Sequence, residues 1–195
     1  GDFYKGTCVR DAEGEGIMKI EDVVIHPVFG HAFFCFEHPE GQLVGLCDAL
    51  GVDCVIHRFA DGWMRPYAGD GTSNEDWYGW GADVLAPFDG RVEEIYINPV
   101  TNTPGVIHPG RASMIRFARE DGVRVVYAHV MNVCVEVGEQ VTAGQVVAQV
   151  GNNGYSRHPH IHIGAWKDDK PLQIRFDLRA MGKQYKELGE EGYIL

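Results

Sequence analysis

The chain lacks several features that would assign it to a common functional class. No run approaches the roughly 18 apolar residues that suggest a membrane span. Lys and Arg are not clustered, although binding to a phosphate backbone depends on such clusters. The net charge of −11 and the pI near 5.2 also disfavour electrostatic capture by an anionic surface. We therefore expect no membrane span and no nucleic-acid partner.

The five cysteines include no CxxC pair, so a thiolate zinc site is not expected. An odd number cannot pair completely within one chain, and the pairing of Cys8, Cys35, Cys47, Cys54 and Cys134 is left open. In an exported protein, one or two disulfides would draw their partners from the first four of these. In a reducing compartment, all five would be reduced and buried.

Length and composition describe an ordinary globular protein. The 195 residues are enough for one domain with additions, and 45% of them are hydrophobic and 23% charged. Gly1-Asp2-Phe3-Tyr4 is not a basic region followed by an apolar segment, so we expect no signal peptide within this chain. The predicted organisation is an N-terminal extension over 1–50, a main domain over 51–170 and a C-terminal tail over 171–195.

Short apolar segments separated by Gly-containing turns indicate an all-β fold. Asp121-Gly122 is a hairpin signal between two of them. A helix is expected only near Leu178 to Leu188. The segments expected to be strands are 23–26, 32–36, 91–97, 113–117, 123–130, 133–137, 145–150 and 160–166. The fold class predicted is a mainly antiparallel β-sandwich or barrel-sandwich core with a short C-terminal helix.

Histidines at metal-site spacings occur in three segments. His57 and Asp61 are four residues apart, His160 and His162 are two apart, and His129 lies between these segments. Residues i and i+2 of a strand project to one face, so His160 and His162 would point the same way. Catalytic zinc takes three ligands from His and carboxylate and leaves the fourth position to water. The chain can supply that set with imidazoles left over for proton transfer.

The order of these motifs resembles the lysostaphin-like (LytM-like) zinc metallopeptidases, which cleave peptide bonds in bacterial peptidoglycan. The family pattern is HxxxD with an inner Gly, an Ala-Pro-x-x-Gly turn, Tyr-Ala-His, a Gly-rich loop and His-x-His. The counterparts of the last four are Ala86 to Gly90, Tyr127 to His129, Gly151 to Gly154 and Pro159 to His162. The segment from Val137 to Val146 is also similar. The resemblance spans about 56–166.

The resemblance implies one zinc ion per chain, with His57, Asp61 and His162 as its ligands. It makes His129 and His160 the catalytic pair, without assigning the base. It also implies an exported enzyme, periplasmic or extracellular, acting on peptidoglycan or a peptide. Two departures stand out: bulky Phe59 replaces the inner Gly, and a long insertion follows Asp61 where the family soon reaches Ala-Pro.

The insertion over 62–81 is rich in aromatic residues, which favours an ordered role near the site. Candidates for the substrate groove are Trp77, Tyr78, Trp80 and Asn153. Histidines 26, 31 and 38 are interleaved with Pro and Phe at no metal-like spacing, and we interpret them as structural or exposed. His108 and His158 are placed near the site or on the surface, not among the ligands.

Two other classes of function remain open. Lipoyl and biotinyl carriers share the Val-Gly-Glu-x-Val pattern, but they need a modifiable Lys at a hairpin tip, which this region lacks. A catalytically inactive family member could act as a binding or regulatory module. Such members lose ligands, whereas all five positions are filled in this interpretation, which favours the zinc endopeptidase.

Overall fold

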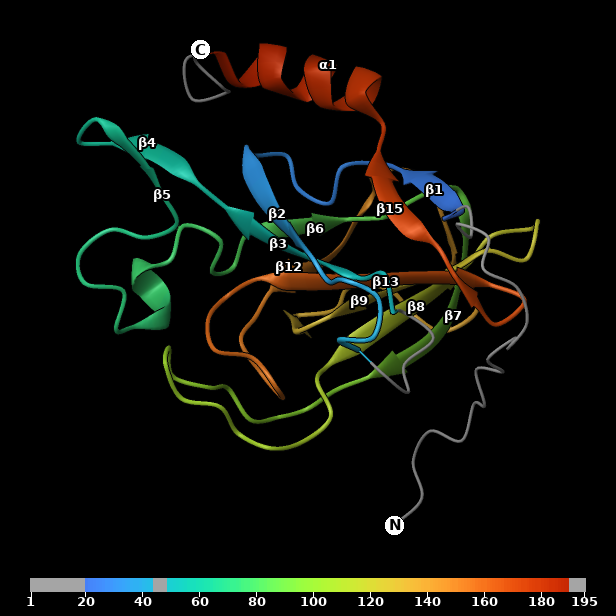
Figure 1. Ribbon diagram of the computed structural model, residues 1–195, viewed down its shortest axis with the longest axis horizontal. Helices are drawn as coiled ribbons and strands as arrows, with labels where there is room; N and C mark the ends of the chain where they lie inside the picture. The colour runs from blue at the N-terminus through green and yellow to red at the C-terminus, as the bar shows by residue number, and fades with distance from the viewer. Residues whose placement is uncertain (1–19, 44–48, 190–195) are drawn as a thin grey trace.

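The computed structural model of the protein describes residues 20–43 and 49–189 (Figure 1). Its largest sheet has eight strands in the order β11-β7-β8-β9-β13-β3-β2, with β14 added beside β13, and every pairing in it is antiparallel. The strands are β2 (Phe33–Glu37), β3 (Val52–Ile56), β7 (Gly90–Tyr96), β8 (Met114–Ala118), β9 (Arg124–Ala128), β11 (Gln140–Val141), β13 (Ile161–Lys167) and β14 (Lys170–Pro171).

Three smaller sheets complete the β structure. A three-stranded sheet has the order β10-β12-β6, from β10 (Val130–Met131), β12 (Val146–Val150) and β6 (Asp83–Leu85). The strands β1 (Asp22–Ile25) and β15 (Gln173–Phe176) pair in parallel, and β4 (Arg58–Ala60) and β5 (Trp63–Arg65) form a hairpin. A short 3₁₀ helix (Asn74–Asp76) and α1 (Leu178–Leu188) are the helical elements of the described residues.

Burial explains why these segments form strands. Alternate residues of β9 are buried, as expected for a strand with one face on a core. The central β13 buries Ile161, Ile163, Gly164 and Ala165, and its partners β3 and β9 flank it on both sides. The large sheet and the three-stranded sheet contribute to one apolar core, in which Phe117, Tyr127 and Val147 are fully buried.

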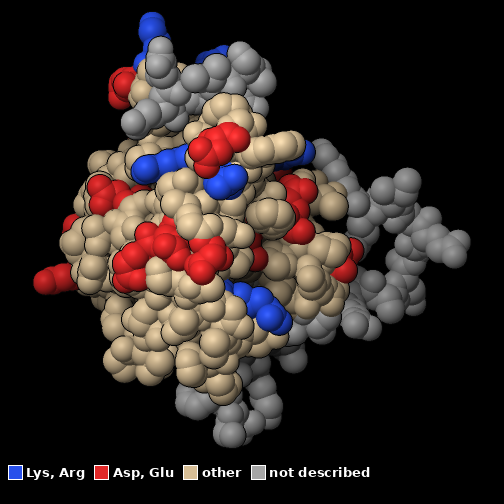
Figure 2. Space-filling model, turned by 90° about the vertical axis from the view of Figure 1, so that its left-hand side faces the viewer, with Lys and Arg blue, Asp and Glu red and all other residues tan. Residues whose placement is uncertain are grey.

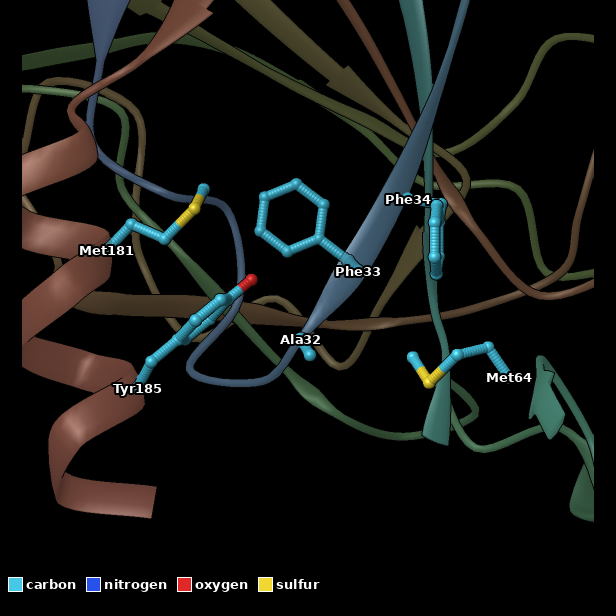
Figure 3. A pocket seen from close by; sticks show the side chains of 6 residues that line it. All are labelled: Ala32, Phe33, Phe34, Met64, Met181 and Tyr185. Atoms are coloured by element: carbon cyan, nitrogen blue, oxygen red, sulfur yellow. The ribbon is translucent and has the colours of Figure 1, made fainter. Parts of the chain in front are cut away.

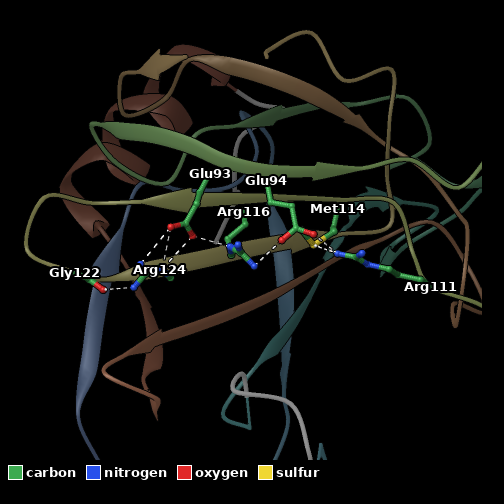
Figure 4. Close-up of polar contacts among 7 residues, drawn as sticks. All are labelled: Glu93, Glu94, Arg111, Met114, Arg116, Gly122 and Arg124. Carbon is green, nitrogen blue, oxygen red and sulfur yellow. Dashed lines mark hydrogen bonds and ion pairs between the residues drawn. The ribbon is translucent and has the colours of Figure 1, made fainter. Parts of the chain in front are cut away.

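Ion pairs cover one face of the large sheet (Figure 4). Glu93 of β7 accepts hydrogen bonds from Arg116 of β8 at 2.7 Å and from Arg124 of β9 at 3.0 Å. Glu94 lies 2.7 Å from the same Arg116. Opposite charges on neighbouring strands favour this register of the sheet. Because these side chains are partly exposed, solvent screens the charges and each pair contributes little to the free energy of unfolding.

The fold class predicted from the sequence is confirmed. The structure is mainly antiparallel β, with a helix at the predicted residues and no closed barrel among residues 20–43 and 49–189. The prediction of a strand over 133–137 is wrong, because this segment forms no strand. Cys134 and Gly138 each donate an isolated backbone hydrogen bond, to Val147 and Val92, but no ladder develops. Strands β3 to β6 were not predicted.

The helix α1 begins at Asp177, whose side chain accepts hydrogen bonds from the backbone of Arg179 and Ala180. It lies across β2 and β15 at one end of the molecule (Figure 1). Met181 and Tyr185 of α1 face Phe33 across an apolar pocket of about 290 Å³, which Ala32, Phe34 and Met64 also line (Figure 3). Within the described ranges, no helix has the length and apolar character needed to cross a membrane.

Candidate metal and catalytic site

The site is organised around the start of β13, because His160 directly precedes this strand and His162 is its second residue. His162 lies directly opposite Asp53 of β3 on one side and Ala128 of β9 on the other. Opposite residues of an antiparallel pair project to the same face, so the side chains of His162 and Asp53 meet. Their Nδ1 and Oδ1 atoms are 2.9 Å apart.

His129 and His160 form a buried pair beside this contact. Their ring centroids are 4.6 Å apart, and the residues are 6% and 7% exposed. His129 follows β9 with a φ of 68°, a left-handed conformation that turns its side chain out of the strand alternation. The Nε2 atom of His160 lies 3.6 Å from Oδ1 of Asp53. The predicted catalytic histidines are thus brought together.

Backbone carbonyls fix the orientation of both rings. Nδ1 of His129 donates to the carbonyl of Asn153 at 2.8 Å, and Nδ1 of His160 donates to the carbonyl of His158 at 2.8 Å. With the proton on Nδ1, a neutral imidazole keeps its lone pair on Nε2. Burial lowers the pKa of His160 to about 4 and lowers the pKa of His129 well below its ordinary value. Both rings are therefore neutral near pH 7 and able to accept a proton at Nε2.

His38 completes a group of three side chains that can hold a metal ion. One ligand atom each from His38, Asp53 and His162 lies within 4.8 Å of the others. Nε2 of His38 is 3.2 Å from Oδ2 of Asp53, yet it is buried and has no hydrogen bond of acceptable geometry. Its Nδ1 is held by Oε1 of Gln42 at 2.9 Å, the outer contact that metal-binding histidines commonly make.

The donor set of this group fits zinc. Two imidazole nitrogens and one carboxylate oxygen are the ligands of many catalytic zinc sites. Burial raises the pKa of Asp53, but the hydrogen bond from His162 and the nearby imidazoles outweigh it and hold that pKa well below its usual range. Asp53 is therefore a carboxylate at neutral pH, as a metal ligand must be.

The structure does not bring the predicted partners of His162 into this candidate group. His57 lies after the end of β3, where its Nδ1 donates to the carbonyl of Val55 and its ring packs on Phe34 at 4.5 Å. Asp61 lies at the turn of the β4–β5 hairpin, with 84% of its side chain exposed and Arg65 at 3.6 Å. Neither belongs to the metal-binding group of the described residues. The two side chains do not share a face because the β4–β5 hairpin begins between these residues.

His38 and Asp53 are the residues that the sequence analysis missed. His38, interpreted as structural or exposed, lies just past the end of β2, and Asp53 is in β3. They are 15 residues apart and meet only because β2 and β3 pair, with Phe36 opposite Asp53. No local spacing marks such a pair. A signal was available in the strand pattern of 52–56, which would have placed a charged Asp53 between apolar neighbours.

The aromatic residues of the insertion have mixed roles. Trp77 stacks on His158, with ring centroids 4.5 Å apart and planes within 4°, and its Nε1 donates to the carbonyl of Gly71. Trp77 thus reaches the segment that carries His160. Tyr78 packs against the core beneath Arg58, and Trp80 is partly buried.

Asn153 has a different role from groove contact. It is 4% exposed, its Oδ1 accepts from the backbone of Ser113 at 2.7 Å, and its Nδ2 donates to the carbonyl of Val130 at 2.9 Å. Because its own carbonyl holds the ring of His129, Asn153 positions that histidine from behind. Both polar atoms of its side chain are therefore engaged within the protein.

Glycines let the loop that contains Asn153 pass close to its neighbours. A Cβ at Gly154, where φ is +64°, would lie 2.5 Å from Cα of Ala112. Gly154→Ala is therefore expected to destabilise the protein by about 2 kcal/mol or more, from backbone strain and overpacking together. Gly182→Ala in α1 is the matched control, because nothing lies within 4 Å of the added methyl and alanine favours a helix. Urea unfolding of both variants tests this, and equal midpoints would contradict it.

Comparison with known proteins places this chain in a known family. Residues 77–174, just over half of the chain, match Peptidase family M23. The mainly antiparallel β fold fits this match. The chain belongs to peptidase family M23.

Individual relatives are similar over part of their length. The chain is 35% identical over 101 residues to an uncharacterized metalloprotease of Haemophilus influenzae, covering 52% of this chain and 18% of that protein. It is 35% identical over 84 residues to the glycyl-glycine endopeptidase ALE-1 of Staphylococcus capitis, covering 43% and 21%. The catalytic domain of lysostaphin from Staphylococcus simulans matches with a TM-score of 0.45 and 23% identity, covering 70% and 81%. The chain spans about a fifth of the length of these curated relatives.

The matched range contains His129, His160 and His162 but begins after His57 and Asp61. Within it, the segment Gly79-Trp-Gly-Ala-Asp83 is similar to HxxxD: Asp83 and an inner Gly are at the positions of the pattern. The segment also lies shortly before Ala86-Pro87, as the motif does in the family. It has Gly79 where the pattern has histidine. A Cβ at Gly79 would lie 4.0 Å from the carbonyl oxygen of Pro159, so this position borders the site. Because position 79 offers no imidazole, His38 is the residue that would supply the second histidine of the candidate group.

Proposed function

We propose that the chain is a zinc-dependent endopeptidase that hydrolyses amide bonds in peptidoglycan cross-links or glycine-rich peptides. The observation that carries the proposal is the group of His38, Asp53 and His162 next to the neutral pair His129 and His160. One zinc ion per chain would be held by the first three residues. The peptide substrate class is supported by the family and by the printed name of ALE-1.

The chain's own residues supply the proton chemistry. When bound, zinc would polarise the scissile carbonyl and lower the pKa of the attacking water. One of His129 and His160 takes the water proton at Nε2 and returns it to the leaving amine. The other takes up a proton from solvent at Nε2 as charge develops on the carbonyl oxygen, donates a hydrogen bond to that oxyanion, and returns the proton when the carbonyl forms again. The carbonyls of Asn153 and His158 keep both rings turned so that Nε2 faces this space.

Export to the periplasm or the cell exterior is part of the proposal, since peptidoglycan lies outside the membrane. The net charge of −11 does not favour electrostatic attraction to an anionic cell wall, so the substrate would have to be recognised by contacts other than charge pairs. Figure 2 shows Asp and Glu side chains gathered near the centre of one face and Lys and Arg side chains separated from one another. A neutral glycine-rich bridge or an uncharged part of a stem peptide suits such a surface best.

A second function has one specific observation in its favour. Gly79 stands where the family motif has histidine, as in a member that has lost its metal and acts as a binding or regulatory module. The two functions differ in metal content. An enzyme assembled as proposed should bind close to one zinc per chain, whereas the regulatory module should bind none.

The test of the proposed activity is digestion of purified peptidoglycan with the zinc-loaded chain. Two preparations should be compared, one cross-linked by glycine bridges and one cross-linked directly between stem peptides. Mass spectrometry of the products would show which bond is cleaved. Intact cross-links in both preparations, with zinc bound, would contradict the proposal.

The insertion over 62–81 should affect this activity without affecting the metal. Asn74 donates to the carbonyl of Asn102 at 2.8 Å and accepts from Asn152 at 2.9 Å, so the insertion is tied to the loop that positions His129. Replacing residues 67–76 by a short Gly-Ser linker is expected to change KM or the preferred cross-link while zinc content stays the same. Unchanged kinetics on both cross-link types would show that the insertion does not contact substrate.

A further inference from the structure

Two cysteine thiols face each other beside the metal-binding group. Cys35 of β2 lies directly opposite Cys54 of β3, and their sulfur atoms are 3.7 Å apart. Cys54 is completely buried, whereas Cys35 is exposed on the outermost strand of the large sheet. The remaining described cysteine, Cys134, is exposed and contacts the carbonyl of Val146.

The register of β2 and β3 makes this a pair that can be bridged. The backbone of His57 donates to Ala32, and the backbone of His38 donates to Gly51, which marks these two pairs as hydrogen-bonded. Hydrogen-bonded and non-hydrogen-bonded pairs alternate along an antiparallel ladder. Cys35 and Cys54 therefore form a non-hydrogen-bonded pair, whose Cα atoms are about 4.5 Å apart and whose side chains are closer. That separation lies within the range that disulfides span.

The bridge would join β2 and β3, the strands that position two of the three candidate metal ligands. Asp53 precedes Cys54 in β3, and His38 follows the end of β2 three residues after Cys35. Among the described residues, β3 is the one strand that pairs with β2, so this pairing contributes to keeping Nε2 of His38 3.2 Å from Asp53. A covalent link at Cys35 would fix β2 next to the group.

We propose that Cys35 and Cys54 form a reversible disulfide that fixes β2 to β3 and so retains the metal held by His38, Asp53 and His162. The cross-link itself rests on the cysteine geometry alone, and its effect on metal retention rests on the proposed function. The oxidant is a small-molecule disulfide such as glutathione disulfide, or a protein disulfide of an oxidising compartment.

The chemistry balances as two thiol–disulfide exchanges. The exposed Cys35 thiolate attacks one sulfur of glutathione disulfide, forming a mixed disulfide and releasing one glutathione thiolate. The Cys54 sulfur then attacks the Cys35 sulfur of the mixed disulfide and releases the second. The two protons lost by the protein thiols go to the two glutathione thiolates. The protein pair is oxidised and glutathione disulfide is reduced to two thiols.

The cross-link is tested on the full-length zinc-loaded chain in glutathione buffers from reducing to oxidising. After alkylation with N-ethylmaleimide and digestion, mass spectrometry should find Cys35 joined to Cys54, with a rise in Tm of about 5 °C or more over the reduced protein. Cys134→Ser should behave as the unaltered chain, and Cys35→Ser should show neither the cross-link nor the rise. Alkylation of both cysteines in the most oxidising buffer, or Cys35 joined to Cys8 or Cys47, would overturn the proposal.

The effect on the metal is measured as the rate of zinc transfer to a chromogenic chelator. The oxidised protein should release zinc more slowly than the reduced protein, and the difference should vanish in Cys35→Ser. Equal rates would overturn the link to metal retention. If the cross-link forms but the chain holds no zinc in either state, the proposed function fails while the disulfide stands.

Discussion

Asp53→Ala should lose most of the bound zinc, because it removes the carboxylate that contacts all three imidazoles around it. Oδ1 of Asp53 lies 2.9 Å from His162 and 3.6 Å from His160, and Oδ2 lies 3.2 Å from His38. Removing one of three ligands leaves too few donors for a catalytic zinc site. Zinc content per chain after dialysis, measured by elemental analysis, gives the result directly.

Matched controls separate this ligand set from the one that the sequence suggested. Asp61→Ala and Asp83→Ala also remove a carboxylate, from residues outside the metal-binding group, and should keep their zinc. His38→Ala should lose zinc, whereas His57→Ala should not. The reverse pattern, with zinc kept in Asp53→Ala and lost in Asp61→Ala, would restore the HxxxD segment at 57–61 as the source of ligands.

His129→Ala and His160→Ala should each keep zinc and fold, yet lose activity by about a hundredfold or more. The size follows from what a positioned acid or base contributes to hydrolysis. Both side chains lie outside the metal-binding group, and their Nδ1 atoms are bound to carbonyls, which leaves Nε2 for the reaction. Steady-state cleavage of a susceptible cross-linked peptide, with zinc measured on the same samples, tests this.

A histidine remote from the site controls for general effects of the substitution. His26 contacts Pro27 and Gly144 and none of the proposed site residues. His26→Ala should therefore leave activity unchanged. Loss of zinc in His160→Ala would mean that His160, rather than His162, is the ligand within the His-x-His segment. Full activity in either catalytic variant would remove that residue from the mechanism.

Features of the fold that are encoded locally were predictable. The helix at Leu178–Leu188 has a run of good helix formers preceded by Asp177, and the segments around β7, β8, β9, β12 and β13 alternate or form short apolar runs. The paired histidines followed from the order of Tyr-Ala-His and His-x-His, each of which is a short local motif. The same argument failed for 133–137, where apolar residues alternate but backbone hydrogen bonds to neighbouring strands stay isolated and form no ladder.

The candidate metal ligands meet through contacts that no short motif contains. His57 and Asp61 have a convincing spacing, but a hairpin begins between them and carries Asp61 into solvent. His38 and Asp53 have no recognisable spacing, and they meet because an edge strand pairs with its neighbour. Only the register of that pairing, which depends on packing throughout the sheet, brings them within reach of His162.

The position of β2 at the edge of the large sheet should affect how a bound metal ion exchanges. His162 lies in β13, which pairs with a strand on each side. His38 follows β2, which pairs with β3 at the edge of the sheet. Edge strands open locally at a lower free energy than central ones. Amide protons of β2 should therefore exchange with solvent faster than those of β13, and zinc should slow the former far more than the latter. Release of the ion would then be paced by the fraying of one strand rather than by unfolding of the domain.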